Sequence, residues 1–218
     1  MPTITAIEPS RRREGRFELL VDGKAHSTVS IDIIERLGLR VGAELHGGTE
    51  ALERETTLLA TYDRAMRMLA FRARAATELR RALIRKGEVP EFVDAAIDRL
   101  TRAGFLDDGA FARQFASARA AGGRASRRRI QQELSRRGVA RDTADDAIAE
   151  VYAEDAVDEA MVAVEAARRK SRSMQALDPA VRTRRLYAFL ARRGYGADEI
   201  RQAMAAVAGD AAKLDAAD

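Results

Sequence analysis

The chain has 218 residues, 46% hydrophobic and 33% charged, which excludes a disordered polyelectrolyte and is typical of a folded globular protein. It has no cysteine, so disulfides and thiolate zinc sites are excluded, and no apolar run approaches the roughly 20 residues of a membrane helix. The formal net charge is only +4, although the chain contains 38 Lys and Arg residues. Because residues 1–10 lack the basic and then apolar order of a signal peptide, we expect a cytoplasmic protein.

Residues 1–60 are predicted to form a small β-rich region. Asp22-Gly23 is a strong signal for a two-residue hairpin turn, because both residues tolerate positive φ. Ser30 or Asp32 is expected to cap a short helix that follows the hairpin. The expected extended segments are residues 4–7, 17–21, 25–29 and 41–45.

From residue 62 onward, apolar residues recur at helical spacing. Pro90 suits the first turn of one helix, and Asp107, Asp108 and Ser126 are expected to cap two others. We expect the stretch after Gly209 to fray. The helices whose limits the pattern indicates are 62–74, 77–86, 90–102, 127–138, 142–152, 154–169 and 198–208.

Three glycines mark an internal repeat. Gly87, Gly138 and Gly194 each follow a short basic helix, and they recur along the chain at nearly equal intervals. When these glycines are aligned, the apolar residues fall into matching columns. The columns are Ala96, Ala147 and Ala203; Ile97, Ile148 and Met204; and Leu100, Val151 and Val207.

The predicted fold is therefore mainly α, with three tandem three-helix units in an elongated array after the β-hairpin region of residues 1–60. Each unit resembles a helix-turn-helix module. The expected units occupy residues 61–106, 107–152 and 153–218, the last with a short C-terminal tail.

The middle helix of each expected unit is basic, and the helix after it is acidic. The middle helices carry net charges of +3, +4 and +5, and the following helices carry −3, −3 and −1. The cations either neutralise the acidic helix beside them or face an acidic protein surface or a phosphate backbone. The candidate binding residues, which we call the basic stripe, are Arg80, Arg81, Arg85, Lys86, Arg127, Arg128, Arg129, Arg136, Arg137, Arg184, Arg185, Arg192 and Arg193.

Sequence-specific DNA reading is disfavoured. A helix-turn-helix module places its last helix in the major groove, with polar and basic residues at its start. Here the corresponding helices begin with acidic residues such as Glu88, Glu91 and Asp142, which phosphates repel. Nonspecific phosphate contact through the middle helices stays open, with single- or double-stranded DNA.

No residue pattern points to catalysis, a cofactor or a metal. The only histidines, His26 and His46, have no neighbouring ligand cluster, and no Gly-Lys-Ser/Thr follows Gly47-Gly48 as a phosphate loop requires. Asp107 and Asp108 could bind a metal, but helix capping explains the pair more simply. We expect a protein that is not an enzyme.

The order and spacing of several segments resemble the RecX family of bacterial recombination regulators. The most telling segment is 104–108, Gly-Phe-Leu-Asp-Asp, with Phe111 and Phe115 after it. The other segments that carry the resemblance are 4–8, 21–23, 78–87, 111–112, 129–130, 133–134, 138 and 186–194.

This resemblance implies tandem three-helix units and no catalytic centre. It also implies a partner of the RecA recombinase that binds in the helical groove of the RecA–DNA filament. The expected effect is modulation, above all inhibition, of the ATPase, recombinase and coprotease activities of RecA in homologous recombination and the SOS response. Separately from the resemblance, we expect a monomer with no role at a membrane. The alternative is a DNA-binding helix-turn-helix regulator.

Overall fold

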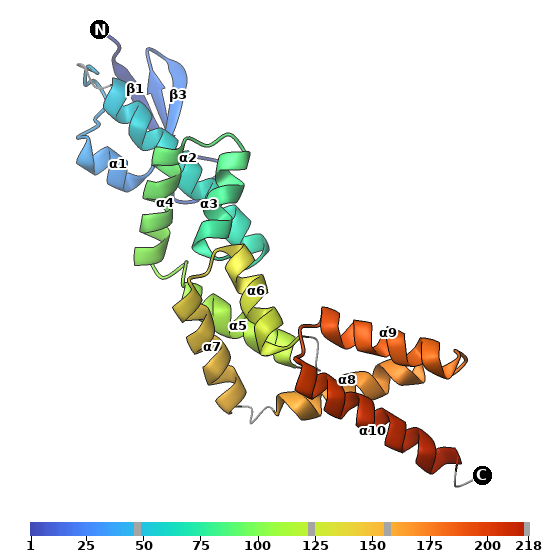
Figure 1. The fold of residues 1–218 in the computed structure, drawn as a ribbon. Coiled ribbons are helices and arrows are strands. Elements are labelled where there is room, and N and C mark those ends of the chain that lie inside the picture. The colour runs from blue at the N-terminus through green and yellow to red at the C-terminus, as the bar shows by residue number, and fades with distance from the viewer. Residues whose placement is uncertain (46–48, 122–124, 155–157, 216–218) are drawn as a thin grey trace. The chain divides into compact units, whose positions relative to one another are not determined.

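The computed structural model describes residues 1–45, 49–121, 125–154 and 158–215 (Figure 1). In these ranges three strands and a short helix precede nine further helices, which form three successive groups of three. The mainly α class, the three-helix units and the small N-terminal sheet are thereby confirmed. The residues divide into two compact units. These are Met1–Ala73 with Glu78–Leu106, and Arg74–Thr77 with Asp107–Asp218. The elongated arrangement and the domain limits stay predictions.

An antiparallel sheet opens the chain, in the order β1-β2-β3. Its strands are β1 (Ile4–Pro9), β2 (Phe17–Val21) and β3 (Lys24–Val29). Asp22 and Gly23 connect the last two with φ values of 49° and 74°, the two positive values that a tight hairpin requires. The predicted hairpin is confirmed.

Helix α1 (Ile31–Arg36) follows the sheet, and Ser30 occupies its N-cap position. The capping mechanism that we expected is nevertheless absent, because the Ser30 hydroxyl makes no hydrogen bond to the helix and is buried without a partner among the described residues. The extended segment expected at 41–45 is also wrong. It contributes only an isolated bridge between Thr3 and Glu44, in addition to backbone bonds such as Leu45 N to Pro2 O at 2.9 Å.

The first compact unit continues with the first three-helix unit. Its helices are α2 (Thr49–Phe71), α3 (Ala76–Arg85) and α4 (Pro90–Arg102). The helix start expected at residue 62 is wrong, because Leu52 and Leu59 extend α2 into the core beneath the sheet. Helix α2 packs against both α4 and β3. It therefore joins the sheet to the first group of helices.

The second compact unit contains two of the three-helix units, six helices in all. They are α5 (Asp108–Ala120), α6 (Arg127–Arg137), α7 (Arg141–Glu154), α8 (Glu159–Arg172), α9 (Pro179–Arg192) and α10 (Ala197–Asp215). Their buried residues form one alanine-rich cluster around Ile130 and Leu134 and a second around Leu186 and Leu190. Two expected limits are wrong. Glu154 ends α7 and does not begin α8, and α10 continues through Gly209 to Asp215.

The capping residues confirm most of the predicted helix limits. Asp107 accepts a hydrogen bond from Ala110 N at 2.8 Å, and Ser126 accepts one from Arg129 N at 3.2 Å. Gly138 ends α6 with a φ of 87°, in the left-handed region that glycine adopts without strain. The repeated alanine column is buried in all three groups, with Ala96 and Ala203 at 0% and Ala147 at 2% exposure.

Candidate partner-binding surface

The basic stripe lies on three helices that the cores hold in equivalent ways. Each middle helix buries two leucines or an isoleucine and a leucine, four residues apart. The stripe residues occupy the remaining faces of α3, α6 and α9 or directly follow these helices. What each stripe residue can bind depends on the contacts that it already makes inside the chain.

Arg80 is neutralised by the helix that follows it. Its Nε and Nη2 lie 2.5 and 3.0 Å from the two carboxylate oxygens of Asp94 on α4. Hydrogen bonding from Arg80 lowers the pKa of Asp94 below its usual value. At this position the basic helix and the acidic helix after it neutralise each other, which is one of the two interpretations of the sequence.

Arg127 makes three contacts with two neighbouring residues, Glu159 and Tyr152. Its backbone amide donates to Glu159 Oε1 at 2.9 Å, its Nε lies 3.9 Å from Glu159 Oε2, and its guanidinium lies 4.2 Å from the ring centroid of Tyr152. Burial raises the pKa of Tyr152 to about 12 and also raises the pKa of Glu159. Arg127 therefore links α6 to α7 and α8.

The contact at Arg127 has a counterpart in the preceding repeat. The backbone amide of Ala76 donates to Asp108 Oδ1 at 2.8 Å, as the amide of Arg127 donates to Glu159. An acidic residue at the start of a first helix thus caps the preceding middle helix. We assigned Asp108 to its own helix from the sequence, but only Asp107 caps α5. The register that aligns Gly87 with Gly138 was the signal that could have identified both pairs.

Several other stripe residues also interact within the chain. Arg129 Nε donates to Glu133 at 3.0 Å, four residues along the same helix. The guanidinium of Arg137 lies 4.9 Å from the Phe115 ring centroid, and that of Arg193 lies 4.3 Å from the Phe189 ring centroid. Burial lowers the pKa of Arg193. Arg81 and Arg136 also have interaction partners inside the chain.

The rest of the stripe is open to a partner. Six of its side chains are exposed and make no hydrogen bond or ion pair with any residue that the structure describes. We call them the unpaired cations: Arg85, Lys86, Arg128, Arg184, Arg185 and Arg192. They occur in all three units, and the structure thus narrows thirteen candidates to six.

The hollow between middle and last helices differs from unit to unit. In the group α5–α7 it measures about 510 Å³ and is lined by Arg128 and Gln131 among others. In the group α8–α10 it measures about 530 Å³, and Arg184 and Tyr187 take the equivalent positions. In the first group the position equivalent to Gln131 belongs to Arg80, which binds Asp94. The position of Gln131 is therefore polar in the second unit, aromatic in the third, where Tyr187 occupies it, and occupied by an ion-paired arginine in the first.

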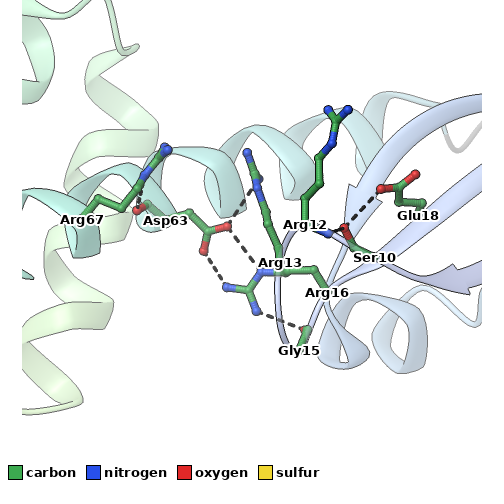
Figure 2. A network of polar contacts seen from close by, with 8 residues as sticks. All are labelled: Ser10, Arg12, Arg13, Gly15, Arg16, Glu18, Asp63 and Arg67. Atoms are coloured by element: carbon green, nitrogen blue, oxygen red, sulfur yellow. Dashed lines mark hydrogen bonds and ion pairs between the residues drawn. The ribbon is translucent and has the colours of Figure 1, made fainter.

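An unexpected network holds the loop between β1 and β2 against α2 (Figure 2). Asp63 of α2 accepts a hydrogen bond from Arg16 Nη2 at 2.5 Å, and its carboxylate lies 3.6 Å from Arg13 Nη1. At the start of the loop, Ser10 Oγ donates to Glu18 at 3.1 Å. The sequence did not predict this network, because nothing local pairs Arg16 with a residue as distant along the chain as Asp63.

The remaining candidate residues are described only in part. His26 is exposed, whereas His46 and Gly47-Gly48 lie outside the described residues. Among the described residues, no group of three or more His, Asp or Glu side chains could hold a metal ion. Within those same ranges, no helix is both long and apolar enough to cross a membrane.

Three family models match the chain in tandem. They describe the first, second and third three-helix domains of RecX and match residues 62–100, 107–148 and 158–204. A regulatory protein RecX of Pelodictyon phaeoclathratiforme is 31% identical over 140 residues, covering 64% of this chain and 84% of the relative. One of Mycobacterium avium is 37% identical over 130 residues, covering 60% and 74%.

Solved structures share the fold. A crystal structure of a regulatory protein RecX superposes with a TM-score of 0.73 at 21% identity, covering 92% of this chain and 98% of that one. RecX from Lactobacillus salivarius gives a TM-score of 0.56 at 16% identity, covering 69% and 96%. The order of the three domain matches and the 31% identity to a relative that is matched over 84% of its length lead to one conclusion: the chain belongs to the RecX family of regulatory proteins.

Proposed function

We propose that this protein binds the filament of the RecA recombinase and inhibits its ATPase, recombinase and coprotease activities in homologous recombination and the SOS response. Membership of a family of regulatory proteins supports a regulatory role. The observation that carries the proposal is the placement of unpaired cations on the middle helix of each unit.

A filament presents the same surface at regular intervals, and a chain of three similar units can bind several of these surfaces at once. Each additional contact then forms within an existing complex, so weak individual contacts add to a strong overall affinity. The unpaired cations suit this role because they lose no internal ion pair on binding. Stripe residues such as Arg80 and Arg127, which are already paired, serve the fold in this proposal.

In this proposal the protein acts as a cytoplasmic monomer without a cofactor. Inhibition results from occupation of the filament groove, which can block growth of the filament or disturb its cycle of ATP hydrolysis. No side chain of the regulator needs to react.

A DNA-binding regulator is the alternative, and the unpaired cations would also suit phosphates. The last helix of a unit is poorly suited to binding in the major groove. Glu91 lies in the first turn of α4 and Asp142 in the first turn of α7, where a recognition helix needs polar and basic residues. Sequence-specific recognition therefore has less support than filament binding.

The test is to measure DNA-dependent ATP hydrolysis and strand exchange by RecA with increasing amounts of the full-length protein. We expect both activities to fall at amounts well below one regulator per RecA protomer, because each chain spans several protomers. Unchanged activities at a stoichiometric amount, together with tight binding to one duplex sequence, would favour the DNA-binding regulator.

A further inference from the structure

A hollow of about 540 Å³ lies between the end of α8, the turn after it and α9. Three cations line it: Lys170 from α8, and Arg185 and Arg192 from α9. The rest of the lining consists of small or apolar side chains and Ser173, and no carboxylate of the described residues belongs to it. None of the three cations forms an ion pair with a described residue.

The preceding unit shows how the chain neutralises the equivalent position. In the register that aligns Gly138 with Gly194, Arg129 corresponds to Arg185 and Glu133 corresponds to Phe189. Glu133 accepts from Arg129 Nε at 3.0 Å and also lies 2.9 Å from Arg119 Nη2. The last unit replaces this carboxylate by an aromatic ring and leaves Arg185 without a counterion among the residues that the structure describes.

Phe189 also keeps positive charge near the hollow. Lys170 Nζ lies 5.9 Å from the ring centroid of Phe189, and Arg193 lies 4.3 Å from the same ring. The same unit does contain an ion pair, but it lies outside the hollow: Asp210 pairs with Arg168 at 2.8 Å. The three lining cations repel one another until an anion binds between them.

We propose that this hollow binds the phosphate groups of a nucleic-acid backbone. Helix α9 carries no acidic residue, so nothing along it repels a continuous polyanion. Guanidinium groups bind phosphate oxygens through two parallel hydrogen bonds, and Arg185 and Arg192 have all their donors available. Consecutive phosphates can offset several cations at once, whereas a protein surface of mixed charge also presents cations to α9. The site deepens the proposed function by naming DNA of the filament as one ligand, but its test needs no RecA.

The test compares two double variants of the full-length protein that lose the same charge from the last three helices. Arg185→Ala with Arg192→Ala removes two cations from the hollow. Arg182→Ala with Arg201→Ala removes two cations that lie outside both the hollow and the basic stripe. Binding of a fluorescent single-stranded oligonucleotide is followed by anisotropy at several salt concentrations.

We expect the hollow variant to bind at least tenfold more weakly. The slope of log K against the logarithm of the salt concentration should fall in magnitude by about 1.4, because each phosphate contact on a single strand contributes about 0.7 to it. The control should stay within about threefold of the wild type. Ala188→Glu, which adds a carboxylate to the lining without removing a cation, should weaken binding as well. Equal losses in both double variants, or no loss in the hollow variant, would overturn the proposal.

Inhibition of the RecA ATPase by the same variants separates the two proposals. A hollow variant that binds the oligonucleotide normally but no longer inhibits RecA would show that the hollow binds acidic protein, and would overturn the phosphate site. A wild-type protein that binds the oligonucleotide through the hollow but has no effect on RecA would refute the proposed function and leave the phosphate site intact.

Discussion

The backbone amide of Arg127 donates to the carboxylate of Glu159 at 2.9 Å, across the boundary between two repeats. Ala76 and Asp108 make the same contact one repeat earlier, at 2.8 Å. In each case an acidic residue of one repeat satisfies a free amide at the start of the preceding middle helix, a group that would otherwise need water or a local cap. Part of the charge in this chain therefore joins the repeats together.

Replacing Glu159 by alanine should lower the free energy of unfolding by about 1 kcal/mol, because the start of α6 loses a capping acceptor. Urea denaturation measures the change. Glu150→Ala is the matched control, because Glu150 forms only an exposed ion pair with Arg113 at 3.6 Å, and we expect it to cost less than about 0.5 kcal/mol. A Glu159 variant as stable as the control would contradict the capping role.

Tyr152 should make stability depend on pH in the alkaline range. Burial raises the pKa of its phenol to about 12, above the 10.0 of an exposed tyrosine, so folding favours the neutral form. This contribution is fully present below pH 10 and is lost as the pH rises toward 12. The difference in tyrosinate absorbance between the wild type and Tyr152→Phe should show a midpoint near 12. A midpoint near 10 would refute the shift.

Gly138 and Gly87 form a natural pair for separating backbone strain from crowding. Both have positive φ, 87° and 86°, but a Cβ at Gly138 would lie 2.4 Å from Thr77 Cβ, whereas a Cβ at Gly87 meets nothing within 4 Å. Gly87→Ala should cost about 1–2 kcal/mol from strain alone. Gly138→Ala should cost about 1–3 kcal/mol more. Equal melting temperatures for the two variants would contradict this difference.

The elongated array is tested by the size of the protein in solution. A single compact globule of 218 residues has a radius of gyration of about 17 Å. Small-angle X-ray scattering should give a clearly larger value if the three units follow one another in a row. A measured radius equal to that of the compact globule would exclude that arrangement.

The repeat was predictable because its marks are local. A glycine that ends each middle helix and an alanine column such as Ala96, Ala147 and Ala203 recur at regular spacing, and the structure buries all three alanines. The start of α2 was missed because Leu52 and Leu59 stand among charged residues and threonines. Their burial depends on contact with the sheet, which the periodicity of one segment does not reveal.

The spacing of residues in the sequence could not predict which members of the basic stripe are paired inside the chain. Arg80 and Arg128 have similar surroundings in the sequence, yet one binds Asp94 and the other has no partner among the described residues. The difference arises because the fold brings carboxylates from distant positions in the sequence to Arg80 and Arg127. Only three-dimensional placement could separate the unpaired cations from those that the chain uses itself.

Inhibition of RecA by two triple variants of equal charge tests the role of the unpaired cations most directly. One variant replaces Arg85, Arg128 and Arg184 by alanine, and the other replaces Arg80, Arg129 and Arg137. The measurement is the amount of protein that halves the DNA-dependent ATPase rate of RecA. We expect this amount to rise at least tenfold for the first variant and less than threefold for the second. An equal rise in both, or no inhibition by the wild-type protein, would contradict binding of the filament through the unpaired cations.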